Sequence, residues 1–131
     1  SMGARLILAT GNYYLNWLGW IAGDLNQVRG GTALAINTWY LAEFSSDGST
    51  WNISLNGVPE TLTIITGINN GNWLGDDTHL TPQLSLGILK NAGADIQGFK
   101  GIIGETWEYG NRKLTNAEVN HIHQETKGRY Q

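Results

Sequence analysis

The tetrapeptide Asn-Trp-Leu-Gly occurs twice in this chain, at residues 16–19 and 72–75, and two aspartates follow the second copy. A saccharide has apolar C–H faces that stack on aromatic rings, and hydroxyl groups that bond to amides and carboxylates. The second copy carries both kinds of group among turn-forming residues, so no alternation of apolar residues explains its indole. We therefore predict a saccharide-binding segment made of Asn72, Trp73, Asp76 and Asp77. The alternative is an indole that packs beneath its own loop.

Four further aromatic residues are candidates for the same site. Trp17 and Trp20 lie three positions apart in the apolar run 13–21, and Trp107 and Tyr109 would share one face of a strand. Each pair is compatible either with the core or with an exposed platform for a ligand. We include all four among the predicted ligand-binding residues.

No arrangement of residues predicts catalysis. Glu105 and Glu108 are three positions apart, which in a strand sends them to opposite faces, whereas glycoside hydrolysis needs two carboxyl groups flanking one bond. His121 and His123 are two apart in an expected helix and point to different faces, and His79 lies in a polar loop. The chain has no cysteine, so a thiolate metal site is excluded. We predict that the protein is not an enzyme, and we assign no histidine as a ligand or base.

The composition limits the partners. The chain has 131 residues and a formal net charge of −3, which argues against nucleic acid and anionic membrane surfaces as partners. No apolar run reaches the roughly 20 residues of a transmembrane helix, so membrane insertion is not expected. We expect one domain, residues 1–131, with Ser1-Met2-Gly3 as a remnant of expression.

Short runs of strand-forming residues, separated by turn signals such as Asp47-Gly48 and Asn56-Gly57, predict an all-β fold. In the run 51–55 every second residue is apolar, so one face of that strand belongs to a core. Trp39 and Trp51 each lie within such a strand pattern and are predicted to be core residues. The expected strands are 5–9, 13–21, 33–36, 39–44, 51–55, 62–65, 83–89 and 100–109.

One helix is expected, at the C-terminus. Thr115 and Glu118 form the pattern of a capping box, and Gly128 stands where a glycine would end the helix. The helix would dock through one face, made of Val119, Ile122 and Thr126.

The order of these signals resembles that of laminin-G-like, concanavalin A-like jelly-roll domains. The matching segments are the hairpin from Asn37-Thr38-Trp39 through Asp47-Gly48 to Asn56-Gly57-Val58, then 84–87, 99–105 and 113–119. The resemblance covers the chain from Ala33 to its end, and it departs from the family pattern at Gly104 and Glu108. It implies an antiparallel sandwich of two sheets with one short C-terminal helix, and recognition of glycans or of other proteins.

Many members of this family hold Ca²⁺ through loop carboxylates, which are the oxygen ligands that this cation prefers. The resemblance therefore leaves Ca²⁺ open at Asp76 and Asp77, although both side chains could equally form turns with their own backbone. No other cofactor is expected.

The expected function is non-catalytic carbohydrate binding, by an adhesion module of an extracellular or phage-virion protein. Its partners would be a carbohydrate or polysaccharide and the other domains of a parent protein. One alternative is a structural or protein-interaction module, in which the same aromatic side chains bury against a neighbour. A second alternative is a degenerate relative of a glycosidase.

Overall fold

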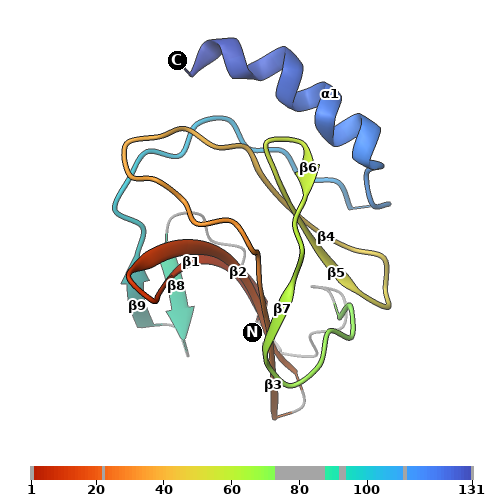
Figure 1. Cartoon of the computed structure of the whole chain (residues 1–131). Helices are drawn as coiled ribbons and strands as arrows, with labels where there is room; N and C mark the ends of the chain where they lie inside the picture. Colours follow the sequence, from red (N-terminus) through yellow and green to blue (C-terminus); the bar gives the residue numbers. More distant parts are fainter. Residues whose placement is uncertain (1, 22, 73–87, 92–93, 111, 131) are drawn as a thin grey trace.

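The computed structural model describes residues 2–21, 23–72, 88–91, 94–110 and 112–130, and in this part of the chain the fold is mostly β (Figure 1). A four-stranded antiparallel sheet has the strand order β1-β2-β3-β7. Its strands are β1 (Met2–Ala9), β2 (Asn12–Ile21), β3 (Asp24–Arg29) and β7 (Thr63–Thr66).

A three-stranded antiparallel sheet has the order β4-β5-β6, and β8 and β9 form a separate hairpin. The C-terminal helix α1 (Asn116–Thr126) continues into a short 3-10 helix, η2 (Lys127–Arg129). Neither helix is long and apolar enough to cross a membrane. The remaining strands are β4 (Ala42–Ser46), β5 (Trp51–Leu55), β6 (Val58–Pro59), β8 (Ile88–Asn91) and β9 (Ala94–Gly98).

The tight turns follow from residues that tolerate a left-handed backbone. Asn56 and Gly57 have φ angles of 52° and 79°, the conformation of a two-residue hairpin turn between β5 and β6. A Cβ on Gly57 would lie 2.7 Å from the Cα of Asn120 in α1, so this glycine also allows the helix to dock on the turn. At the β4–β5 turn, the Asp47 carboxylate accepts the backbone N–H groups of Ser49 and Thr50 at 3.0 and 2.8 Å. Both predicted turns are confirmed.

The core lies between the two larger sheets. Leu15, Val28, Trp51, Ile53 and Leu55 form one buried cluster drawn from β2, β3 and β5. Trp51 and Ile53 are each 1% exposed, which confirms the apolar face predicted for 51–55. The core is therefore built from the alternate residues of facing strands.

The capping box of α1 is confirmed. Glu118 N–H donates to the Thr115 hydroxyl at 3.2 Å, and the Glu118 carboxylate accepts the Thr115 backbone N–H at 2.8 Å. Val119 and Thr126 are buried on the predicted docking face, and Ile122 is half-buried. Gly128 does not end the helix, because the chain continues through Lys127 into η2.

Two predicted strands, 33–36 and 100–109, are wrong, and the observed strands β3 and β9 were not predicted. Residues 24–29 form β3, which the sequence did not indicate because its buried residues include Asn26 and Gln27, and amides are typical of turns. Residues 33–36 form only a single bridge, between Leu34 and Tyr13. Residues 100–109 contain no strand, so an alternating side-chain pattern does not apply to them.

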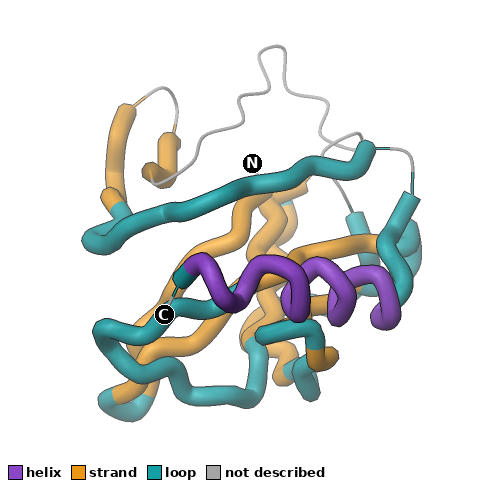
Figure 2. The backbone as a smooth tube through the Cα atoms, turned by 90° about the horizontal axis from the view of Figure 1, so that it is seen from above, coloured by secondary structure: helices purple, strands orange, loops and turns teal. Residues whose placement is uncertain are grey.

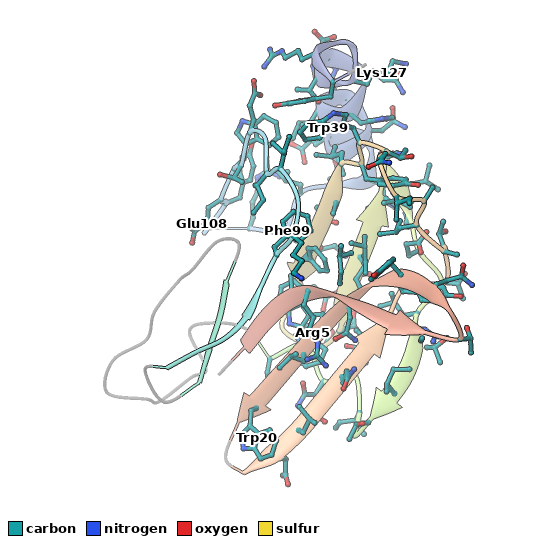
Figure 3. All side chains as sticks on the ribbon, turned by 90° about the vertical axis from the view of Figure 1, so that its left-hand side faces the viewer. Arg5, Trp20, Trp39, Phe99, Glu108 and Lys127 are labelled. Carbon is teal, nitrogen blue, oxygen red and sulfur yellow. The ribbon has the colours of Figure 1, made fainter. Side chains whose placement is uncertain are left out.

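Trp39 is also placed differently from its prediction. It is 42% exposed and lies outside the core, because it precedes β4 and packs against Tyr130 from the C-terminal end. Figure 2 shows the extended segment 99–110 running beside α1, and Trp39 lies close to this helical end of the molecule (Figure 3).

Candidate functional site

The best candidate site is a hollow of about 260 Å³ beside the C-terminal helix. Four separate parts of the chain line it: the segment before β4, the β5–β6 turn, the extended segment 99–110, and the end of α1 with η2. We call this hollow the aromatic cleft. Its lining residues are Trp39, Tyr40, Leu41, Asn56, Gly104, Glu105, Trp107, His123, Thr126, Lys127 and Tyr130.

Tyr130 joins two sides of the cleft. Its ring centroid lies 4.8 Å from that of Trp39, with the two planes tilted by 39°. Its hydroxyl accepts the backbone N–H of Glu105 at 3.0 Å. A Cβ on Gly104 would lie 2.8 Å from two atoms of the Tyr130 side chain, so only glycine lets the extended segment approach this closely. The aromatic wall is therefore positioned by contacts between residues far apart in the sequence.

A second set of contacts fixes the strand side of the cleft. The Asn56 side-chain oxygen accepts the Leu41 N–H at 2.9 Å, and the Asn56 N–H donates to the Leu41 carbonyl at 2.8 Å. The Tyr40 hydroxyl accepts the backbone N–H of Ala35 at 3.0 Å. The backbone on which Trp39 stands is thus held in place from the β5–β6 turn.

The cleft also carries charged and polar groups. Glu105 forms an ion pair with Arg129 at 2.5 Å, and the Lys127 ammonium donates to the side chain of Gln124. The Nδ1 atom of His123 is buried and has no hydrogen-bond partner among the described residues. Cationic, anionic and imidazole groups therefore lie around the aromatic residues, as a site for a polar ligand requires.

Trp39 and Trp107 are the two most accessible aromatic groups of the cleft, with 42% and 45% of their surfaces exposed. Their indoles accordingly offer apolar faces to a ligand, and each indole also has a hydrogen-bond donor at its edge.

A larger hollow, of about 410 Å³, lies on the other side of α1 and is lined in part by Tyr109 and Ile122. Its two oppositely charged side chains, Arg112 and Glu118, bind each other through two hydrogen bonds of 2.8 and 2.7 Å. These bonds hold the pKa of Glu118 at about 2, with help from the Thr115 N–H. Because Tyr109 is the single Trp, Tyr or Phe among its lining residues, we regard this hollow as the weaker candidate.

Of the predicted site residues, Trp107 lies in the aromatic cleft and Tyr109 in the larger hollow. The two therefore do not form one platform, which corrects the expectation of a shared strand face. Trp20 is 48% exposed on β2, away from both hollows. Trp73, Asp76 and Asp77 lie outside the described residues.

Trp17 and Asn72 meet around Trp51. The Trp17 and Trp51 rings are stacked with centroids 6.0 Å apart, and Phe44 packs against Trp17 at 5.5 Å. The indole N–H of Trp51 donates to the Asn72 carbonyl. The backbone N–H of Trp51 donates to the side-chain oxygen of Asn69 at 2.6 Å. The structure therefore assigns Trp17 to packing and anchors the backbone at Asn72 to β5.

Sequence reasoning missed Tyr130, Lys127 and the exposed position of Trp39. One feature of the sequence could have indicated Tyr130: it is an aromatic residue just after the expected helix. At that position its ring does not contribute to the apolar face of the helix and so needs another partner. Nothing in the local sequence indicates that it meets Trp39, because the two are joined only by the docking of α1.

Among the described residues, no three histidine, aspartate or glutamate side chains are placed to share a metal ion. Comparison of the chain with models of protein families, with curated proteins and with solved structures finds no match in any of the three.

Proposed function

We propose that this chain is a non-catalytic carbohydrate-binding module with a concanavalin A-like jelly-roll fold, and that the aromatic cleft binds the saccharide. The observation that carries this proposal is the grouping of two half-exposed indoles, Trp39 and Trp107, with Tyr130 around one hollow. The mostly β fold with two antiparallel sheets is compatible with the proposed sandwich.

The chemistry of the cleft suits a sugar ring. The apolar C–H face of the ring stacks on an indole, which removes both surfaces from water. The hydroxyl groups at the ring edge bond to charged side chains, with Glu105 as an acceptor and Lys127 as a donor. A volume of about 260 Å³ admits one or two sugar units rather than a whole chain, so a longer polysaccharide would cross the cleft with only part of its length bound.

In this proposal the chain acts as an adhesion module of an extracellular or virion-surface protein, with the parent protein's other domains as neighbours. Calcium is not assigned a part, since the carboxylates for which it was considered lie outside the described residues.

A protein-interaction module is the second candidate, and a specific observation favours it. Phe99, Ile102 and Ile103 are 44%, 76% and 45% exposed in the extended segment that also carries Trp107. Exposed apolar side chains in sequence along one segment are typical of surfaces that bind other proteins.

The experiment compares Trp107→Ala with Trp20→Ala, a control of nearly equal exposure on β2. A glycan array first identifies a ligand for the unmodified chain, and calorimetric titration then measures its affinity. We expect Trp107→Ala to weaken binding about thirtyfold, which corresponds to roughly 2 kcal/mol for a central aromatic residue. Trp20→Ala should bind normally, and Trp107→Ala should melt close to the unmodified protein.

Three results would count against this proposal. Unchanged glycan affinity in Trp107→Ala would remove the cleft as the site. Absence of any glycan ligand, together with association that Ile102→Ser abolishes, would favour the protein-interaction module. Release of reducing sugar by the unmodified chain but not by Glu105→Gln would support the glycosidase alternative.

A further inference from the structure

Two arginines flank a buried asparagine on the face of the four-stranded sheet that points away from the core. Arg5 on β1 is opposite Asn16 on β2, and Asn16 is opposite Arg29 on β3. Residues directly opposite in antiparallel strands share a face, and adjacent strands are about 5 Å apart, so the two arginine backbones are separated by roughly 10 Å. Both guanidinium groups can thus reach the same ligand.

The asparagine holds one of these arginines in place. Asn16 is completely buried, and its amide nitrogen donates to the Val28 carbonyl at 2.6 Å. Its amide oxygen accepts the Nε–H of Arg5 at 2.9 Å. This arrangement fixes the stem of Arg5 and leaves the forked end of the guanidinium without a hydrogen bond to a described residue.

Arg29 is held by an aromatic ring. Its guanidinium carbon lies 4.5 Å above the centroid of the Tyr14 ring, a cation–π contact. Its Nε atom is buried and has no hydrogen-bond partner in the part of the chain that the structure describes. Buried donors are almost always paired in native proteins, so this donor is free for an acceptor that the described residues do not supply.

The charges of this region are not balanced among the described residues. No described carboxylate lies within ion-pair distance of Arg5 or Arg29, whereas Arg112 and Arg129 each have a glutamate partner. Burial lowers the pKa of Arg5, which shows that its charge is partly removed from water. An arginine remains ionised at neutral pH, so a half-buried pair without an anion is electrostatically unfavourable.

We propose that Arg5 and Arg29, positioned by Asn16 and Tyr14, form a binding site for the carboxylate group of a small ligand. The planar guanidinium fork matches a carboxylate with two parallel N–H···O bonds, and Tyr14 keeps the Arg29 plane in one orientation. The chain's net charge of −3 disfavours a long polyanion, so a single carboxylate is the better match. The site is separate from the aromatic cleft, as the positions of Arg5, Trp39 and Lys127 show (Figure 3), and it does not depend on the proposed function.

The test titrates the chain with sodium acetate, D-glucuronate and D-glucose at constant ionic strength, while NMR follows the Nε–Hε signals of the arginines. Carboxylate ligands should shift the signals of Arg5 and Arg29 in a saturable manner and leave that of Arg112 unchanged. D-Glucose should shift neither, because it has no carboxylate. If D-glucuronate binds at least tenfold more tightly than acetate, the site recognises the sugar ring as well as the carboxylate, and the ligand is an acidic sugar. If the two bind equally tightly, the carboxylate group alone is sufficient for binding.

Variants separate binding from folding. Arg29→Gln should weaken carboxylate binding at least tenfold, and Arg29→Lys should weaken it by a smaller factor because it keeps the charge but lacks the fork. Arg112→Gln, at an exposed arginine, is the control and should bind as the unmodified chain does. Arg5→Gln removes the partner of the Asn16 side chain and could therefore unfold the protein. If Arg5→Gln does not fold, the affinity of Arg29→Lys for the carboxylate ligands decides whether the arginine pair binds them.

Two outcomes would overturn the proposal. One is the absence of saturable shifts at Arg5 and Arg29 with either carboxylate. The other is equal weakening by Arg29→Gln and Arg112→Gln, which would show that the anions respond only to overall charge.

Discussion

Ile53 gives the sharpest test of the core between the two sheets. Its side chain is 1% exposed on β5, within the buried cluster that includes Val28 and Trp51. Ile53→Ala removes three carbon atoms, worth about 0.8 kcal/mol each when fully buried, or roughly 2.4 kcal/mol in total. Incomplete collapse of the resulting cavity raises the expected loss to about 2–5 kcal/mol.

The matched control is Ile64→Ala on β7, where the same side chain is 54% exposed. About half of its surface is already in water, so the same arithmetic gives roughly 1 kcal/mol. Urea unfolding followed by tryptophan fluorescence measures both losses as a shift in the transition midpoint at constant slope. A loss below about 1 kcal/mol for Ile53→Ala, or equal losses for the two variants, would refute the assigned register of β5.

Two further predictions concern the helical end of the molecule. Gly104→Ala should displace Tyr130, because the added Cβ would lie 2.8 Å from its ring. The affinity for the glycan should then fall, while the free energy of unfolding in urea should change less than in Ile53→Ala. An unchanged glycan affinity would contradict the arrangement of the cleft. The Arg112 hydrogen bonds hold the pKa of Glu118 at about 2, below its ordinary value of 4.5, so its stabilising contribution is complete above pH 4.5 and is lost as the pH falls towards 2. Thermal melts should therefore show a steeper loss of stability over this range in the unmodified chain than in Glu118→Gln, and parallel curves would contradict this.

The parts of the fold that could be predicted from sequence are those set by local chemistry. The turns at Asp47-Gly48 and Asn56-Gly57, the capping box at Thr115, and the apolar face of 51–55 each depend on a few neighbouring residues. Strand β3 could not be predicted, because its buried Asn26 is satisfied only by tertiary contact: its side-chain oxygen accepts the Ile68 N–H at 2.8 Å. Long-range hydrogen bonding of this kind leaves no periodic pattern in the sequence.

The tryptophans show the same limit for the candidate site. Trp17, which was compatible with either role, is stacked on Trp51, whereas Trp39, expected in the core, is 42% exposed. What decides between core and surface is the partner across the interface: Trp51 lies on the facing sheet, and Tyr130 is reached only after α1 has docked. Alternation of apolar residues indicates that one face of a strand is buried, but it does not indicate at which residues of the strand that burial begins and ends.

Gly104 connects the sequence pattern with the cleft. It is a position at which this chain departs from the laminin-G-like pattern, and in the structure a side chain there would collide with Tyr130. The Tyr130 hydroxyl in turn accepts the N–H of Glu105, and the Glu105 carboxylate is paired with Arg129, the neighbour of Tyr130. The departure at 104 and the aromatic residue at 130 therefore depend on each other physically, since either one without the other would leave this wall of the cleft open. In this structure a larger residue at 104 would therefore have to displace Tyr130 and change the shape of the aromatic cleft.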